Sequence, residues 1–263
     1  MGHLYIFFMV DEMNIQEQDE LVSLIEIAIR QADEAGNKIL VFPEMLGTHR
    51  MKEIIKDRLN DENLRNLHFI VFPGIWDKKG KHKNTNVSYV IDFEGNEWFG
   101  QHKLREFPLE NEEGTFLEDI IEGKQIHLIH YKEYGSIAIA VCRSELDSDI
   151  KDLLMNKLNV KLILCPSWST GSHEFSRSIL TGVEKNCNAV WCNTCSALSN
   201  KKVNKENVGI ITSFGKNRNY SRIDLNECKF PKDNCRMDCE NGCLFSKKIF
   251  GTDYCESQVE NDD

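Results

Sequence analysis

The sequence predicts a layered α/β protein, with one large domain over residues 1–216 and an irregular, cysteine-rich extension over residues 217–263. Two observations support this fold class. Residues 39–42 and 137–141 are apolar throughout instead of alternating with polar residues, which is typical of strands covered on both faces. Similar strands recur along the chain, each followed by a polar or helical stretch, and this alternation favours a layered α/β architecture.

The individual elements follow from the hydrophobic periodicity. Residues 21–32 place apolar side chains on one helical stripe, and Gly36 lies just past it as a C-terminal stop. Glu94-Gly95-Asn96 predicts a hairpin turn. Further helices are expected in a charged segment up to about residue 66 and over residues 147–158 and 172–185. Strands are expected over residues 5–10, 38–42, 68–72, 88–93, 126–129, 136–141, 160–164, 189–193 and 209–214.

The composition lowers the expectation of several partners. The chain has 263 residues with 42 acidic and 32 basic side chains, so its formal charge is −10, whereas nucleic acids and anionic membranes attract basic surfaces. The apolar run at residues 4–10 is too short for a signal peptide or a spanning helix. We therefore expect a soluble, cytoplasmic protein with no nucleic-acid and no membrane partner. Thiols stay reduced there, so the ten cysteines are core residues, a nucleophile or metal ligands.

Several catalytic signatures are absent from the sequence. It contains no G-x-G-x-x-G, no G-x-x-x-x-G-K-[ST], no H-E-x-x-H and no G-x-S-x-G. A nucleotide-binding enzyme, a zinc protease and a histidine-based triad are therefore disfavoured, and no cofactor is expected.

Three apolar strands each run into a side chain that can do chemistry. Glu44 follows residues 39–43, Lys103 follows the segment after the hairpin turn, and Cys142 follows residues 136–141. A carboxylate beyond a buried strand lies at the sheet edge where α/β proteins bind ligands, and a thiol there is a candidate nucleophile. Taken singly, each residue also has an ordinary interpretation, as a solvated loop glutamate, a charged surface loop or a core cysteine.

Taken together and in this order, the three residues resemble the catalytic set of the carbon–nitrogen hydrolase (nitrilase/amidase) superfamily. That family has a strand ending in Phe-Pro-Glu, an Asn-x-x-x-hydrophobic strand with a Gly turn before the lysine, and a strand that delivers the cysteine. The matches here are Phe42-Pro43-Glu44, Asn86 through Gly95 to Lys103, and Val141-Cys142. A later strand ending in proline is matched by residues 162–166. The resemblance covers roughly residues 4–216 and implies a nitrilase-like αββα four-layer sandwich.

The resemblance also implies a role for each of the three residues. Cys142 would attack the substrate carbon and form a covalent thioester-type intermediate. Glu44 would be the general base, and Lys103 would stabilise the tetrahedral intermediate. The chemistry agrees, because a free thiol is only a few per cent thiolate near pH 7 and needs a base and a nearby cation.

Other residues are assigned by the same resemblance. A second glutamate follows the lysine in the family, and Glu110 is the preferred match with Glu112 as the alternative. The backbone N–H of Arg143 would be a second donor to the oxyanion. Ser167 and Trp168 would line the substrate pocket, although Trp168 could equally be a buried residue under the rim of the sheet.

The implied activity is cofactor-independent hydrolysis of a non-peptide C–N bond in a small amide, ureide or nitrile, with amide preferred. A homodimer or higher homo-oligomer is expected from the same resemblance. Residues 143–146, Arg-Ser-Glu-Leu, depart from the aromatic, acidic and Arg-Phe-Pro pattern usual in the family. An alternative is therefore a nitrilase-fold binding or scaffold module without turnover, part of a larger assembly.

The tail of the chain is unusually rich in thiols. It contains Cys228, Cys235, Cys239, Cys243 and Cys255. Structural zinc sites usually show paired C-x2–4-C sequences, and only one such cluster occurs here, so we expect no metal. A zinc- or nucleic-acid-binding tail is the second alternative.

Overall fold

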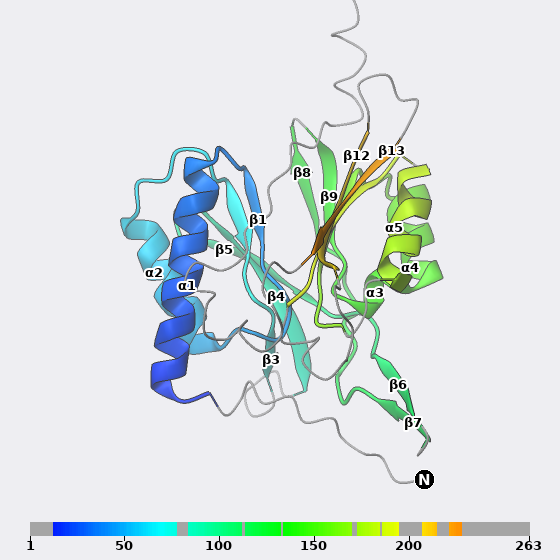
Figure 1. The fold of residues 1–263 in the computed structure, drawn as a ribbon, viewed down its shortest axis with the longest axis horizontal. Helices are drawn as coiled ribbons and strands as arrows, with labels where there is room; N and C mark the ends of the chain where they lie inside the picture. The colour runs from blue at the N-terminus through cyan, green and yellow to red at the C-terminus, as the bar shows by residue number, and fades with distance from the viewer. Residues whose placement is uncertain are drawn as a thin grey trace, which may run out of the picture. The chain divides into compact units, whose positions relative to one another are not determined.

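The computed structural model describes residues 13–77, 84–111, 114–132, 134–169, 173–184, 186–194, 207–214 and 221–227. The chain forms two compact units, one up to Gln125 and one from Ile126 onward. Each unit is built on its own β-sheet, with helices on one face of that sheet (Figure 1).

The first unit contains a five-stranded sheet in the order β1-β2-β4-β3, with β5 paired to β4. Its strands are β1 (Ile39–Val41), β2 (Phe69–Val71), β3 (Ile75–Asp77), β4 (Thr85–Asp92) and β5 (Glu97–His102). β1 and β2 are parallel, and the other pairs are antiparallel. The predicted hairpin joins β4 to β5, and Gly95 adopts a φ of 80° in its turn, which glycine tolerates best. A separate hairpin pairs β6 (Pro108–Asn111) with β7 (Gly114–Leu117).

Two helices cover one face of this sheet, α1 (Ile15–Glu34) and α2 (His49–Asp61) (Figure 1). α1 begins with a capping box, in which Asn14 and Glu17 each bond the other's backbone N–H. α2 begins at Thr48, whose side chain accepts from the Met51 N–H. The core between helices and sheet includes Val22, Ile25, Ile29, Ala32, Leu40, Met51, Ile55, Leu59, Ile70 and Ile91.

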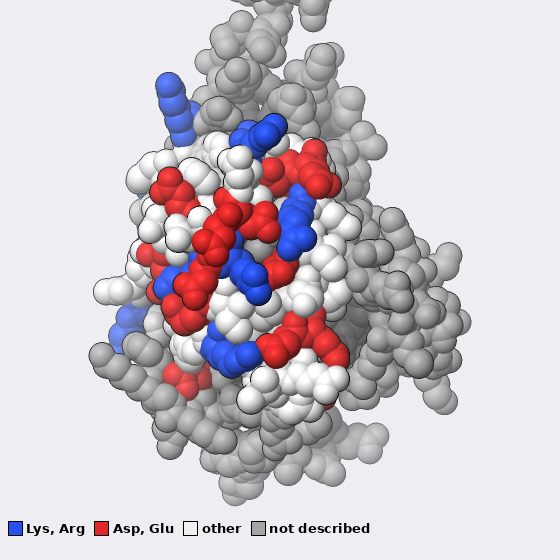
Figure 2. Space-filling model, turned by 90° about the vertical axis from the view of Figure 1, so that its left-hand side faces the viewer, with Lys and Arg blue, Asp and Glu red and all other residues white. Residues whose placement is uncertain are grey.

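The outer surface of α1 and α2 carries charges of both signs, interspersed (Figure 2). Arg30 pairs with Glu26 at 3.4 Å and with Glu62 at 3.1 Å, and Arg50 pairs with Asp19 at 2.7 Å. Exposed pairs of this kind contribute little to stability, so the helices are held by their apolar faces. None of the described helices has the length and apolar composition needed to cross a membrane.

The second unit contains a six-stranded sheet in the order β13-β12-β11-β10-β9-β8. Its strands are β8 (Leu128–Tyr131), β9 (Gly135–Ile139), β10 (Leu162–Pro166), β11 (Asn188–Cys192), β12 (Asn207–Phe214) and β13 (Ser221–Glu227). β9, β10 and β11 are parallel, and the outer pairs are antiparallel. α3 (Arg143–Leu146), α4 (Ser148–Asp152) and α5 (His173–Glu184) lie along one face (Figure 1).

Three parts of the predicted element pattern differ from the structure or lie beyond it. The strand expected at residues 5–10 and the tail cysteines from Cys228 onward lie outside the described residues. The helix expected at residues 147–158 is α4 followed by a π-helical segment, Leu153–Lys157. β13 lies within residues 217–263, which were expected to be irregular; its alternating Ile223 and Leu225 are a period-2 signal that the sequence analysis missed.

Candidate active site

Glu44 is buried at the end of β1, where Pro43 ends the strand. The Phe42 N–H donates to the Val71 carbonyl at 3.0 Å, and the Gly74 N–H donates to the Pro43 carbonyl at 3.1 Å. A β-carbon on Gly74 would lie 2.9 Å from the Glu44 Cα, so this close approach requires glycine. Glu44 itself is 1% exposed, so its carboxyl group is held away from solvent.

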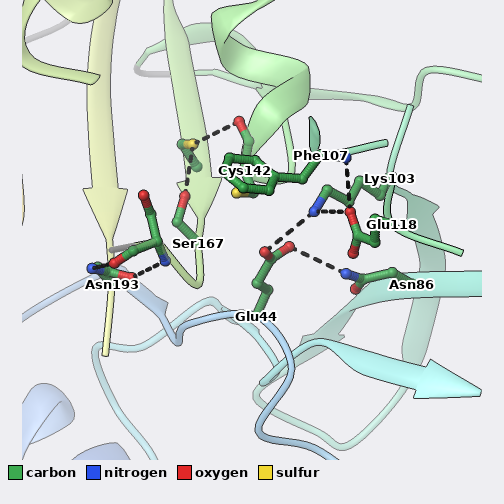
Figure 3. A network of polar contacts seen from close by, with 10 residues as sticks. Glu44, Asn86, Lys103, Phe107, Glu118, Cys142, Ser167 and Asn193 are labelled. Carbon is green, nitrogen blue, oxygen red and sulfur yellow. Dashed lines mark hydrogen bonds and ion pairs between the residues drawn. The ribbon is translucent and has the colours of Figure 1, made fainter. Parts of the chain in front are cut away.

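Lys103 follows β5 and contacts two carboxylates of the first unit. Its N–H donates to the Asn86 carbonyl at 2.8 Å, which holds the residue beside β4. Its Nζ lies 3.4 Å from Oε1 of Glu44 and 2.7 Å from Oε2 of Glu118 (Figure 3). Lys103 is 2% exposed. Because a buried charge requires a partner, the two carboxylates stabilise the buried ammonium.

Asn86 fixes the second oxygen of Glu44. Its Nδ2 donates to Glu44 Oε2 at 3.3 Å, while Lys103 contacts Oε1 (Figure 3). The Asn86 Oδ1 is buried and has no hydrogen-bond partner among the described residues. The Glu44 carboxyl is therefore oriented by a neutral donor on one side and a cation on the other.

Glu118 is the functional candidate that the sequence analysis missed. The β6–β7 hairpin returns the chain so that the Glu118 N–H donates to the Phe107 carbonyl at 3.0 Å, and the Phe107 N–H donates to Glu118 Oε2 at 3.1 Å. Counting residues from Lys103 along the sequence could not identify Glu118, because the hairpin brings residues that are far apart in sequence close together in space. Glu110 lies on β6, with its backbone paired to Thr115; its side chain and all of Glu112 lie outside the described residues.

Cys142 lies in a strained turn between β9 and α3 in the second unit. Its φ of 47° is unusual for a residue other than glycine, and such strain costs on the order of 1–3 kcal/mol. The Cys142 N–H donates to the Pro166 carbonyl at 2.9 Å, and its carbonyl accepts from the Glu145 N–H at 3.0 Å. Cys142 forms no disulfide and is 1% exposed. Neighbouring strands thus hold the turn in a conformation that it would not adopt alone.

Arg143 is the first residue of α3. Its guanidinium points outward and lies 3.9 Å from Glu174, with more than a third of the Arg143 side chain exposed. The N–H groups in the first turn of a helix have no acceptor within that helix. The backbone N–H of Arg143 is therefore of the kind that can donate to a ligand next to Cys142, and its role as an oxyanion donor stays a prediction.

Ser167 and Cys165 surround the main chain of Cys142. The Cys165 thiol lies 3.9 Å from the Cys142 carbonyl oxygen and 3.4 Å from the Ser167 hydroxyl (Figure 3). The Ser167 N–H donates to the Cys192 carbonyl at 2.8 Å. Both predicted pocket residues lie just past the end of β10. Ser167 is fully buried and Trp168 is half-buried.

Asn193 clamps the loop that carries Ser167 and Trp168. Its Oδ1 accepts from the Ser169 N–H at 2.9 Å, and its Nδ2 donates to the Ser169 carbonyl at 2.9 Å (Figure 3). Both contacts are buried. This two-point contact joins the segment after β10 to the segment after β11, and no sequence motif indicated it.

Two other thiols of the second unit are poor nucleophiles. Burial raises the pKa of Cys187 to about 12, with the Glu145 charge as a second cause, and burial alone raises the pKa of Cys192 to about 12. A thiol with so high a pKa contains very little thiolate near neutrality.

No three His, Cys, Asp or Glu side chains of the described residues lie close enough together to hold a metal ion. In the first unit, the lysine ammonium already occupies the space that a cation between Glu44 and Glu118 would take. The two carboxylates therefore fit an internal ion pair.

No protein-family profile and no curated protein sequence matches the chain. Solved structures do match it. The amidase from Nesterenkonia sp. is 16% identical, with 67% of this chain and 70% of that chain covered and a TM-score of 0.53. A mutant of the amidase from Nesterenkonia sp. AN1, with the acetamide moiety of fluoroacetamide added covalently at its active-site cysteine, is 14% identical; the match covers 84% of this chain and 88% of that one, at a TM-score of 0.58. Another mutant of that amidase, in complex with butyramide, is 15% identical, with 67% and 70% covered and a TM-score of 0.54.

These identities are low, so the likeness establishes the fold alone. It agrees with the mixed sheets and the helices of the two units, and it confirms the α/β class predicted from the sequence. A mutant among the solved structures is described as belonging to the nitrilase superfamily. The chain therefore has the fold of the nitrilase-superfamily amidases, which bears out the resemblance to carbon–nitrogen hydrolases.

Proposed function

We propose that this protein is a cysteine hydrolase that cleaves a non-peptide C–N bond, most readily that of a small amide. Cys142 is the nucleophile, Glu44 the general base and Lys103 the cation that stabilises the tetrahedral intermediate. The reaction needs no cofactor. Nitriles and ureides are the other substrate classes within the proposal.

The observation that carries the proposal is the fully buried Lys103 ammonium held between Glu44 and Glu118. Burying three charges is costly, and replacing such a cluster by apolar residues is often neutral or stabilising. A buried cluster of ionisable groups at strand ends is therefore more typical of a catalytic site than of a core. The amidase from Nesterenkonia sp. AN1, which this chain resembles in fold, has an active-site cysteine, and this supports the assignment of the nucleophile to the strand-end thiol.

The proposed reaction begins when Glu44 takes the Cys142 thiol proton and the sulfur attacks the amide carbon. The carbonyl oxygen becomes an oxyanion, stabilised by Lys103 Nζ and the Arg143 N–H. Glu44 then gives its proton to the leaving nitrogen, so ammonia or an amine departs and a thioester remains. Water attacks the thioester after losing a proton to Glu44, and the carboxylic acid leaves as the thiol is restored. One carboxyl group thus carries the proton in both halves of the reaction.

Two glutamates have different proposed tasks. Glu118 lies closer to Lys103 than Glu44 does, at 2.7 Å against 3.4 Å, so it holds the ammonium in place. Glu110 stays a candidate for orienting substrate, as the resemblance implies.

Ser167 and Trp168 are proposed to line the pocket. A homodimer is the proposed oligomeric state, and light scattering of the purified protein tests it.

The first experiment is the alkylation rate of every cysteine, mapped by mass spectrometry, in wild type and in Glu44→Gln and Lys103→Ala. We expect Cys142 to react fastest and to lose that lead in both variants. Matched controls are Lys52→Ala and Glu97→Gln, because Lys52 is also a buried lysine paired with a glutamate in the first unit. These controls should leave the lead of Cys142 unchanged.

The second experiment is ammonia release from a panel of small amides and nitriles. We expect Lys103→Ala to lower kcat/KM by about 10²–10³-fold, the usual effect of removing an oxyanion donor. Glu44→Gln should lower it by about 10²–10⁴-fold, as expected for a general base. If Cys142 reacts no faster than Cys165 or Cys187 and no substrate in the panel releases ammonia, the chain is a binding or scaffold module instead.

A further inference from the structure

Glu145 is a buried carboxylic acid within one turn of the proposed nucleophile. It is 1% exposed and belongs to α3, which begins directly after Cys142. The Glu145 N–H donates to the Cys142 carbonyl at 3.0 Å, so the two residues share one backbone turn. The mechanism proposed above does not use this acid.

The Glu145 side chain is linked to two other helices. Its Oε1 accepts from the Ser178 hydroxyl of α5 at 3.0 Å. The Lys151 ammonium of α4 lies 2.7 Å from the Ser178 Oγ and donates to the Ser178 carbonyl at 2.9 Å. The Glu145 Oε2 is buried and has no hydrogen-bond partner among the described residues. The acid thus ties α3 to α5 and retains an unused acceptor.

The charge state of this acid changes in the neutral range. Burial raises the pKa of Glu145 to about 7, although Lys151 and the Ser178 hydrogen bond act in the opposite direction. The negative charge of Glu145 acts on at least one thiol. After burial, this charge is the next largest cause that raises the pKa of Cys187.

One charged side chain of α3 and one of α5 pair with each other at the surface. Arg143 of α3 pairs with Glu174 of α5 at 3.9 Å, and both side chains are more than a third exposed. Lys161 acts on Cys187 together with Lys151. The Lys151 charge lowers the pKa of Glu145, and the hydrogen bond from the Ser178 hydroxyl lowers it separately.

We propose that Glu145 is a positioning residue for Cys142: its carboxyl group fixes the first turn of α3 against α5, and its ionisation opposes formation of the Cys142 thiolate. The inference rests on the proposed function in that it takes Cys142 to be the nucleophile. It adds that the reactivity of the Cys142 thiol is lowered above neutral pH by the charge of a residue that does not contact substrate.

The size of the effect follows from the separation of the two residues. The Glu145 nitrogen lies 3.0 Å from the Cys142 carbonyl oxygen, so the two residues belong to one hydrogen-bonded turn. Charges within about 10 Å of each other interact appreciably at an effective dielectric constant of about 20. We expect Glu145→Gln to alkylate Cys142 about as fast as wild type at pH 5.5 and about tenfold faster at pH 8.5. Glutamine keeps the oxygen that accepts from Ser178, so the turn is retained.

The test is the pH profile of Cys142 alkylation by iodoacetamide from pH 5.5 to 9, read by peptide mass spectrometry on the full chain. Three variants are compared with wild type. Glu145→Gln removes the charge, and Ser178→Ala removes the donor to the ionised acid. The control, Glu174→Gln, removes an exposed carboxylate of α5.

The proposal expects a ratio of Glu145→Gln to wild-type rates that climbs with pH, and a control ratio that stays near one. Ser178→Ala should move the inflection of the wild-type profile to higher pH, because the ionised acid loses a donor. If Glu145→Gln does not fold, the Ser178→Ala variant tests the proposal instead. A pH-independent ratio, together with an unmoved inflection in Ser178→Ala, overturns the proposal. Failure of the proposed function is distinguished by a different result: Cys142 would then not be the cysteine with the fastest alkylation rate.

Discussion

Glu145 also makes the stability of the fold depend on pH. Burial raises the pKa of Glu145 from 4.5 to about 7, so the folded protein holds this proton more tightly than the unfolded chain does. The stabilisation is therefore fully present below pH 4.5 and is lost as the pH rises through about 7. At about 1.4 kcal/mol for each pH unit, the difference between the two values corresponds to about 3 kcal/mol.

The Glu145→Gln variant reveals this pH-dependent contribution to the free energy of unfolding, because the amide does not titrate. We expect its free energy of unfolding, relative to wild type, to rise by about 2–3 kcal/mol between pH 5 and pH 8. Urea titrations at the two pH values, followed by circular dichroism, measure this difference. Glu174→Gln should show no such rise. A constant difference between Glu145→Gln and wild type at both pH values would refute the reasoning, since it would mean that the acid is ionised in the folded protein, as in the unfolded chain, throughout this range.

Three further predictions concern asparagines whose side chains make defined contacts. Asn86→Ala removes the neutral donor to Glu44, so the acidic limb of the pH–rate profile should move to higher pH and kcat/KM should fall by about tenfold or more, measured by ammonia release. Asn193→Ala removes both contacts to Ser169, so KM should rise more than kcat falls in the same assay. Asn14→Ala removes the cap of α1 and should lower the free energy of unfolding by about 1 kcal/mol in urea titrations, with activity unchanged.

The sequence was most informative where a side chain follows directly from a strand end. Glu44 and Lys103 were each expected at a strand end, and the resemblance to carbon–nitrogen hydrolases implied that they act together; the structure shows them 3.4 Å apart. Cys142 could be placed at the exit of β9 because residues 137–141 are apolar throughout. The strand ends follow from hydrophobic periodicity, which a single sequence displays, whereas the grouping of the three residues followed from the resemblance.

Contacts made through folded-back or neighbouring segments could not be predicted. Glu118 reaches Lys103 only because the β6–β7 hairpin reverses the chain, and no spacing rule counts residues across a turn of unknown length. The clamp of Asn193 on Ser169 joins the ends of two parallel strands, whose relative register the sequence does not specify. Glu145 looked like one more polar residue in an atypical segment, because its burial is set by α5, which lies far along the chain.

The distances around Lys103 suggest why the first unit carries two carboxylates. If Glu44 were the only partner of the ammonium, taking a proton from the thiol would leave a buried cation uncompensated, and the proton transfer would be opposed. In the proposed mechanism, Glu118 at 2.7 Å would remain the charge partner of the ammonium while Glu44, at the longer 3.4 Å, gains and loses a proton. Glu118 would therefore allow the base to cycle without the cation leaving its place. Glu118→Gln should then lower the rate more than a lost hydrogen bond alone would, because Lys103 would pair more tightly with Glu44 and weaken it as a base.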